Sequence, residues 1–179
     1  MNNRHLMSFL FLVLAPALAL PAQTRREVPE RATERIQREV RHEILMLPYY
    51  GVFDNISYKV EGYNVTLMGQ VVRPTLKTDV ARVVKRIEGV EKVDNQIEVL
   101  PVSPMDDQLR LRLYRAIYGF GALERYALPV VKPIRIIVKN GNVVLEGVVD
   151  SEADKNMVNL RAKSVSDVFS VTDHLRVVK

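Results

Sequence analysis

The chain of 179 residues contains no cysteine and no tryptophan, and only three histidines. Without cysteine it cannot form a disulfide framework, a thiol nucleophile, an iron–sulfur cluster, a cysteine zinc site or a cysteine-linked lipid anchor. With so few histidines, a histidine metal site is also unexpected. The composition that remains, 47% hydrophobic and 26% charged, indicates folded domains rather than a disordered or multi-span membrane chain.

Basic residues are in slight excess, with 26 Lys and Arg against 21 Asp and Glu. Residues 33–100 hold ten basic and ten acidic side chains, whereas residues 105–179 hold twelve and nine. The second half is therefore mildly basic. This is compatible with an anionic surface as a partner, but the charges form no polybasic tract.

Motifs for catalysis and for nucleic-acid binding are missing. The sequence has no nucleophile elbow, phosphate loop, dinucleotide-binding glycine run or zinc spacing. His42 and His174 are expected to be surface residues, and Asp106-Asp107 to be favourable charges at a helix start. There is neither the Gly-x-x-Gly loop of KH modules nor the aromatic motif of RRM domains. We therefore expect no catalytic activity, metal, cofactor or nucleic-acid partner.

Residues 1–22 have the order of a secretory signal peptide. Arg4 precedes a largely apolar run, residues 6–20, and small residues follow it. A run of this length is short of the roughly 20 apolar residues that span a membrane. We expect cleavage after Ala22, with Ala19 as the competing site, and export to the periplasm; an uncleaved anchor and a buried helix are the alternatives.

The rest of the chain contains an internal repeat. Its strand and second-helix positions recur 78 residues later without a gap, and an upstream helix recurs at an offset of 73. The second copy therefore carries five extra residues in the loop at residues 121–133. We expect this apolar loop, like the aromatic segment at residues 48–53, to cap a core or fill the joint between copies, with partner binding as the alternative. Matched pairs include Ile36 with Leu109, Val65 with Val143, Leu67 with Leu145, and Gly69 with Gly147.

Each copy predicts the order helix, strand, strand, helix, strand. In the first copy, apolar residues spaced by four, four and three from Ile36 to Leu47 form one helix face, which we expect Thr33 to cap and Pro48 to end. Alternation on both sides of the Gly62 turn predicts a hairpin, as does the Asn140-Gly141 pair in the second copy. Residues 93–100 form the last predicted strand. Arg73-Pro74 and Ser151 to Asp154 are typical of the start of the second helices.

The resulting fold class is α+β, an α/β sandwich with two tandem small domains. Each has two helices on one face of a three-stranded mixed sheet. The predicted boundaries are residues 23–32 for a linker, 33–100 for the first domain, 101–104 for a short proline-containing joint, and 105–179 for the second domain. The predicted core comprises Ile36, Val40, Ile44, Val65, Leu67, Val80, Val84, Ile87, Val93 and Ile97, with their equivalents in the second copy.

This pattern resembles the BON-domain family of bacterial envelope proteins. The residues that carry the resemblance are Gly62-x-x-Val65-x-Leu67-x-Gly69-x-Val71 and Val90-x-x-Val93-x-Asn95-x-Ile97-x-Val99. In the second copy they are Asn140-Gly141-x-Val143-x-Leu145-x-Gly147-x-Val149 and Val168-x-x-Val171-x-Asp173-x-Leu175-x-Val177. Asp173 replaces the usual Asn, and Asn140 replaces the glycine found at Gly62. The marker glycines Gly62, Gly69, Gly141 and Gly147 are expected to be structural.

The resemblance implies a non-catalytic exported protein that binds anionic phospholipid and supports envelope integrity, including under osmotic stress. Single BON domains also occur in secretins and channels, so the alternative is a protein-interaction or scaffolding module of such an envelope assembly.

The first helix of the second copy, residues 105–120, is the candidate contact surface. Beside its core stripe lies an apolar and aromatic stripe framed by arginines, a combination that suits an anionic bilayer surface or a partner. The competing interpretation, that Leu111 and Tyr114 pack on the first domain, is the commoner use of such residues. The candidate contact residues are Arg110, Leu111, Arg112, Tyr114, Arg115 and Tyr118.

Overall fold

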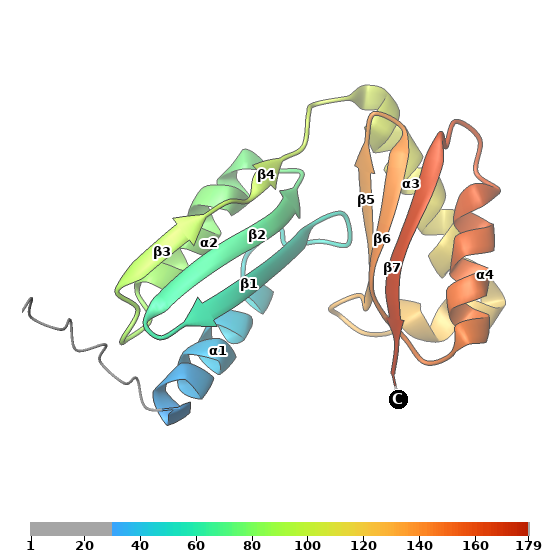
Figure 1. The fold of residues 1–179 in the computed structure, drawn as a ribbon. Coiled ribbons are helices and arrows are strands. Elements are labelled where there is room, and N and C mark those ends of the chain that lie inside the picture. The colour runs from blue at the N-terminus through green and yellow to red at the C-terminus, as the bar shows by residue number, and fades with distance from the viewer. Residues whose placement is uncertain (1–29, 179) are drawn as a thin grey trace, which may run out of the picture.

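Two layered α+β units make up the computed structural model, which describes residues 30–178 (Figure 1). The predicted signal peptide and most of the predicted linker lie outside the described residues. The first unit contains α1 (Glu30–Leu45), β1 (Asn55–Glu61), β2 (Asn64–Val71), α2 (Pro74–Lys85), β3 (Lys92–Asn95) and β4 (Glu98–Val99). The second contains α3 (Pro104–Tyr118), the 3-10 helix η1 (Gly121–Ala127), β5 (Ile134–Lys139), β6 (Asn142–Val149), α4 (Glu152–Lys163) and β7 (Ser170–Val177).

Both sheets have the predicted mixed pairing. β1 pairs antiparallel with β2, and β5 pairs antiparallel with β6. The strand after each crossover helix then adds in parallel: β3 and β4 to β2, and β7 to β6. Two helices cover one face of each sheet (Figure 1). The predicted α+β fold with two tandem units is therefore confirmed.

The third strand of the first sheet differs from the prediction because it is interrupted between β3 and β4. At the interruption the Asn95 Oδ1 accepts a hydrogen bond from the Ile97 N–H, 3.2 Å away, and its Nδ2 donates to the Lys77 carbonyl of α2, 2.7 Å away. Such side-chain bonds to the backbone compete with regular pairing. Asp173, the equivalent of Asn95, accepts the corresponding bond from the Leu175 N–H at 2.8 Å, yet β7 is continuous. What Asp173 lacks is the donor that bonds Asn95 to α2, so this second bond is what distinguishes the interrupted strand.

Local signals explain most element boundaries. Asn140 and Gly141 adopt φ values of 52° and 76°, as the tight hairpin turn requires. The Ser151 side chain accepts from the Asp154 N–H and caps α4, and Pro74 is the first residue of α2. The prediction that Thr33 caps the first helix is wrong, because α1 already begins at Glu30. Residues 30–32 are Glu, Arg and Ala, which all favour a helix.

Gly69 and Gly147 occupy equivalent strand positions where no side chain fits. Their φ values are +112° and +126°. A Cβ would lie 2.0 Å from the Asn55 carbonyl oxygen at Gly69, and 1.9 Å from the Pro133 carbonyl oxygen at Gly147. Both glycines therefore let the neighbouring strand start approach closely.

Each unit has its own core, and most predicted positions are buried. Val93 is an exception: it is half-buried, because β3 lies at the edge of its sheet. Val165 and Val171, the equivalents of Ile87 and Val93, are half-buried as well. The buried members from the prediction are Ile36, Val40, Ile44, Val65, Leu67, Val80, Val84, Ile87 and Ile97, with Leu109, Leu113, Ile117, Val143, Leu145, Val158, Ala162 and Leu175 in the second unit.

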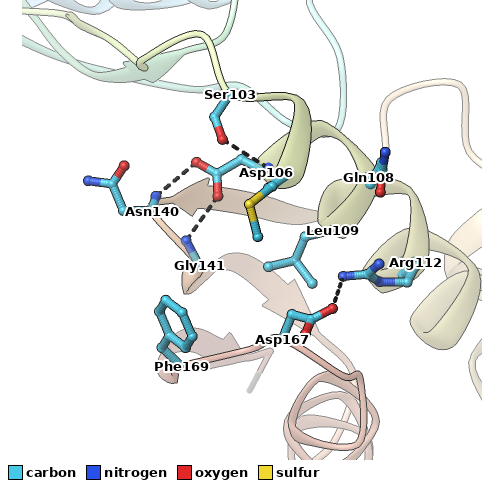
Figure 2. Close-up of a pocket in the computed structure, with 10 residues that line it drawn as sticks. Ser103, Asp106, Gln108, Leu109, Arg112, Asn140, Gly141, Asp167 and Phe169 are labelled. Atoms are coloured by element: carbon cyan, nitrogen blue, oxygen red, sulfur yellow. Dashed lines mark hydrogen bonds and ion pairs between the residues drawn. The ribbon is translucent and has the colours of Figure 1, made fainter.

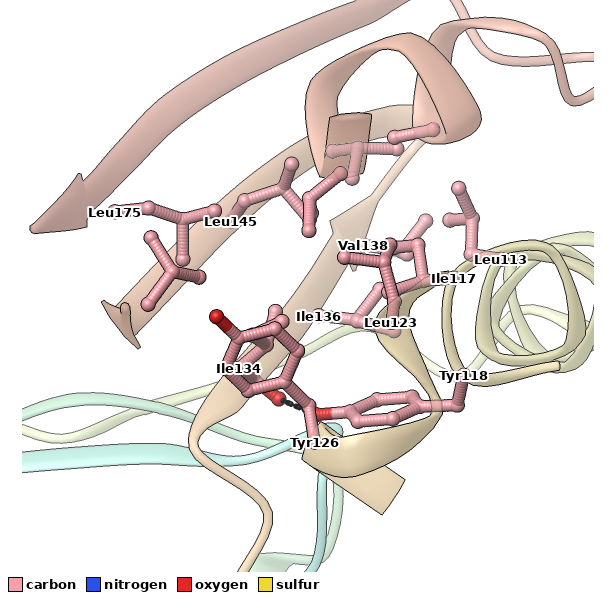
Figure 3. Packing of buried hydrophobic residues seen from close by; sticks show 14 of the residues in the cluster. Leu113, Ile117, Tyr118, Leu123, Tyr126, Ile134, Ile136, Val138, Leu145 and Leu175 are labelled. Carbon is pink, nitrogen blue, oxygen red and sulfur yellow. Dashed lines mark hydrogen bonds between the residues drawn. The ribbon is translucent and has the colours of Figure 1, made fainter. Parts of the chain in front are cut away.

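The five-residue insertion caps the second core, as expected. η1 buries Leu123 and Tyr126 against that core (Figure 3). The Tyr126 hydroxyl donates to the Asp154 carboxylate at 2.9 Å and accepts from the Asp150 N–H at 2.8 Å, which fixes the insertion to the start of α4. Beyond η1, Leu128 and Val130 are exposed.

Candidate functional site

Helix α3, which carries the candidate residues, is anchored firmly at its start. Ser103 is its N-cap and accepts from the Asp106 N–H at 3.2 Å. Asp106 is buried, and its carboxylate accepts from the N–H groups of Asn140 and Gly141 at 2.8 and 2.9 Å (Figure 2). This carboxylate therefore joins the helix start to the β5–β6 turn and fixes the helix over its sheet.

The prediction that Arg110 is a contact residue on an exposed stripe is wrong. Its side chain is 3% exposed; it pairs with Asp107 at 2.5 Å and donates to the Val138 carbonyl at 2.7 Å. A buried guanidinium is stable only with such partners. Arg110 therefore fastens α3 to the sheet and is not available to a membrane.

Tyr118 is likewise buried rather than exposed, so the prediction is wrong here too. Its hydroxyl donates to the Ile134 carbonyl at 2.5 Å (Figure 3). Burial raises the pKa of this hydroxyl well above its ordinary value. Tyr114 is half-buried, with its ring centroid 4.9 Å from that of Tyr118 and 6.4 Å from that of Phe53 in the first unit.

The contact between Tyr114 and Phe53 belongs to a joint made by the segment at residues 49–54. The Val52 carbonyl accepts from the Ile136 N–H at 2.9 Å, so this segment extends the free edge of β5 by one hydrogen bond. Arg135 donates to the Gly51 carbonyl at 2.7 Å, and its guanidinium lies 4.5 Å from the Tyr50 ring centroid. The aromatic face of α3 therefore packs between the two units. For Tyr114 this agrees with the competing interpretation, in which it packs on the first domain.

Asp54 is the buried acid of this joint and is 4% exposed. Its carboxylate accepts from the N–H groups of Gly51 and Val72 at 2.9 and 2.8 Å. Burial raises the pKa of Asp54 above its ordinary value, against the opposing effects of those two bonds and of the nearby Arg135 and Arg110 charges. The group therefore holds the segment at residues 49–54 in shape.

Two predicted residues of α3, Leu111 and Arg115, are exposed. Leu111 is 50% exposed, and Arg115 lies one turn further along the same face. Tyr49 and Arg73 were not among the predicted contact residues, although the aromatic run at residues 48–53 was a signal for Tyr49. Tyr49 is 72% exposed, and the Arg73 guanidinium lies 4.6 Å from its ring centroid. Tyr49, Arg73 and Leu111 line a common cavity of about 300 Å³, which we call the joint cavity.

Arg112 lies on the other side of α3 and is not part of the joint cavity. It pairs with Asp167 at 2.8 Å and donates to the Ser166 carbonyl at 3.3 Å, both in the loop before β7. The six predicted residues therefore separate into three groups: Arg110 and Tyr118 are buried, Tyr114 packs at the joint, and Leu111, Arg112 and Arg115 reach the surface in two places.

Within residues 30–178, no cluster of three histidine or acidic side chains is arranged to hold a metal ion. In the same part of the chain, no helix combines the length and the apolar character that a membrane span requires.

Comparison with known proteins identifies the repeated unit. No curated protein matches the sequence. Solved structures similar to this chain include CdsD, a structural protein of the type III secretion system of Chlamydia trachomatis, at 13% identity and a TM-score of 0.29, covering 80% of this chain and 92% of that one. The C-terminal domain of CdsD matches at 13% identity and a TM-score of 0.28, covering 79% and 96%. The family model of the BON domain matches twice, at residues 32–101 and 122–179, and the chain therefore belongs to the BON-domain family.

Proposed function

We propose that this protein is exported to the bacterial envelope and binds the surface of an anionic phospholipid membrane without catalysing a reaction. In this role it supports envelope integrity, including under osmotic stress. The observation that carries the proposal is the exposed surface around the joint cavity, which Leu111 of α3 lines together with Tyr49 and Arg73 of the first unit, with the exposed Arg115 one turn beyond Leu111.

This surface has the chemistry that an anionic interface favours. Tyrosine is well placed at the headgroup level, a leucine adds apolar contact, and arginine pairs with phosphate. Two acidic residues also line the cavity. Asp54 accepts from two backbone N–H groups and Asp107 is paired with Arg110, so neither is paired with Arg73 or Arg115. A basic residue close to an anionic membrane contributes about 1 kcal/mol, so two arginines supply modest, salt-sensitive binding.

Flotation of residues 23–179 with liposomes tests this proposal. We expect binding to vesicles that contain phosphatidylglycerol or cardiolipin, no binding to purely zwitterionic vesicles, and loss of binding at high salt. Arg115→Gln should weaken binding about fivefold, which corresponds to about 1 kcal/mol. Arg86→Gln, which removes the same charge from an exposed position of the first unit, is the matched control and should bind nearly as the natural protein does. Equal binding to zwitterionic vesicles, or equal losses in both variants, would contradict the proposal.

A second candidate function is a protein-interaction module of an envelope assembly, and β7 is the observation that favours it. This strand has eight residues and lies at the outer edge of the order β5-β6-β7, with no further strand beside it among the described residues. An open edge of this length can accept a strand from another protein. Such a partner should remain bound in detergent and at high salt, whereas arginine-driven lipid binding should not.

A further inference from the structure

A hollow of about 380 Å³ lies at the start of α3, and no residue of the segment 49–54 lines it. We call it the α3 pocket. One wall is formed by Gln108, Leu109 and Arg112 of α3, and the facing wall by Gly141, Asp167 and Phe169 (Figure 2). Met105 also lines it and is 73% exposed, and Phe169 is 77% exposed. The rim therefore presents two large apolar side chains to solvent at a single place.

The first unit shows what occupies the corresponding place there. By the repeat offsets, Gln108, Leu109, Gly141 and Asp167 are equivalent to Arg35, Ile36, Tyr63 and Gly89. A Cβ built on Gly89 would lie 3.3 Å from Arg35, 3.6 Å from Ile36 and 3.7 Å from the Tyr63 ring. The Tyr63 ring, packed on the first core, thus sits among the equivalents of the residues that line the α3 pocket.

The backbones of the two units agree at this place, so the difference lies in the side chains. The Glu91 N–H donates to the Tyr63 carbonyl at 2.9 Å, and its equivalent, the Phe169 N–H, donates to the Gly141 carbonyl at 2.9 Å. Position 141 is glycine and carries no ring. The Phe169 ring covers it instead, 2.7 Å from where a Cβ on Gly141 would lie, and forms one wall of the α3 pocket.

The arginine that bonds to the loop before the last strand also occupies a different helix position in the two units. Arg35 donates to the Glu88 carbonyl at 2.9 Å, whereas in the second unit the equivalent carbonyl of Ser166 is reached by Arg112, one helical turn later. Position 108 is an exposed glutamine. The space beside the helix start is therefore left open between Gln108 and Phe169.

From this comparison we infer that the α3 pocket is a docking site for an aromatic side chain of a partner protein. The pocket lies among the positions that are equivalent to those around the Tyr63 ring in the first unit, and the Leu109 side chain and the Phe169 ring give it apolar walls. Its charges do not favour a lipid phosphate: Asp106 and Asp167 are acidic, and its one basic residue, Arg112, is paired with Asp167. The inference does not depend on lipid binding at the joint cavity.

The test uses p-cresol, which is the tyrosine side chain as a free molecule, in an NMR titration of residues 23–179. Saturable shifts of the Gln108, Gly141 and Asp167 amide signals are expected. They should be lost in Gln108→Trp, whose indole fills the hollow, and retained in Gln37→Trp, the matched change at an exposed position of α1. Phe169→Ser removes one wall from an exposed site, so it should keep the fold and weaken p-cresol binding at least threefold.

Four results would overturn the inference. One is the absence of saturable shifts at the pocket, and another is their persistence in a folded Gln108→Trp protein. The third is an equal response to 4-methylcyclohexanol, the saturated analogue, which would indicate an apolar hollow without preference for a ring. If only lysophosphatidylglycerol moves these signals, the pocket takes a lipid chain and the inference is also wrong.

Discussion

The hydroxyl of Tyr118 offers a sharp test of the buried arrangement of α3. Tyr118→Phe removes one oxygen and leaves the ring in place. The lost bond runs to the Ile134 carbonyl at 2.5 Å, and Tyr118 and Ile134 are 4% and 0% exposed. A buried hydrogen bond contributes about 1 kcal/mol, and a carbonyl that loses its partner adds to the cost. We therefore expect the free energy of unfolding to fall by about 1–2 kcal/mol.

Urea unfolding followed by circular dichroism measures this difference, and Tyr114→Phe is the matched control. Tyr114 lies one turn earlier on the same helix, and its hydroxyl makes no hydrogen bond within the described residues. Its loss should change stability by less than about 0.5 kcal/mol. If the two variants were equally stable, Tyr118 would not be bonded to the β5 backbone and α3 would not be oriented as described.

The burial of the Tyr118 hydroxyl also predicts how the free energy of unfolding depends on pH. Burial raises the pKa of Tyr118 above its ordinary value, so the folded protein keeps this proton longer than the unfolded chain. The associated stability is fully present below the unfolded pKa of about 10 and is lost as the pH rises through the folded pKa. The natural protein should thus lose stability above about pH 10 more steeply than Tyr118→Phe. Parallel curves would show that the hydroxyl is not buried.

Two further predictions concern a strand glycine and the joint. Gly147→Ala should lower the free energy of unfolding by at least about 2 kcal/mol, because φ is +126° and the new Cβ meets the Pro133 carbonyl oxygen. Thermal unfolding measures this difference. The control is Gly121→Ala, where a Cβ meets nothing within 4 Å, and this variant should be nearly as stable as the natural protein. Asp54→Asn should change the pH dependence of stability. Burial raises the pKa of Asp54, so its contribution is present below the unfolded pKa of about 3.9 and is lost as the pH rises through the folded value. The natural protein should therefore gain stability relative to the variant as the pH falls, and a constant difference between pH 3 and 7 would contradict this.

The fold was predictable because its signals are local. Spacings of three and four residues mark α1 and α3, alternation marks the hairpins, and Asn140-Gly141 allows the positive φ values that its turn needs. The repeat added a second, independent instance of each element. The start of α1 was less predictable, since Thr33 is a good cap residue but the three residues before it are good helix formers as well.

The accessible surface of α3 was harder to predict, because a helical periodicity gives the angle of a side chain and not what lies opposite it. Arg110 was expected outside, since arginine is rarely buried without partners. It is buried because Asp107, one turn before it, and the Val138 carbonyl of β5 together satisfy its charge. The carbonyl belongs to a residue 28 positions away, and no pattern around Arg110 indicates it.

The two copies have the same fold but expose different side chains, and part of this difference follows from how the two units pack together. Val52 and Phe53 of the first unit pack against the core of the second, so the joint adds apolar burial to two cores that are each small. Such burial uses the aromatic face of α3 around Tyr114. On α3, surface for partners is then left in two places: beside the joint cavity, with Leu111 at its wall and Arg115 one turn further on, and at the α3 pocket, where Gly141 stands in place of Tyr63. One helix in this way lines the joint cavity through Leu111 and the α3 pocket through Gln108, Leu109 and Arg112. A variant at Arg115 should therefore leave p-cresol binding unchanged, and a variant at Gln108 should leave liposome binding unchanged.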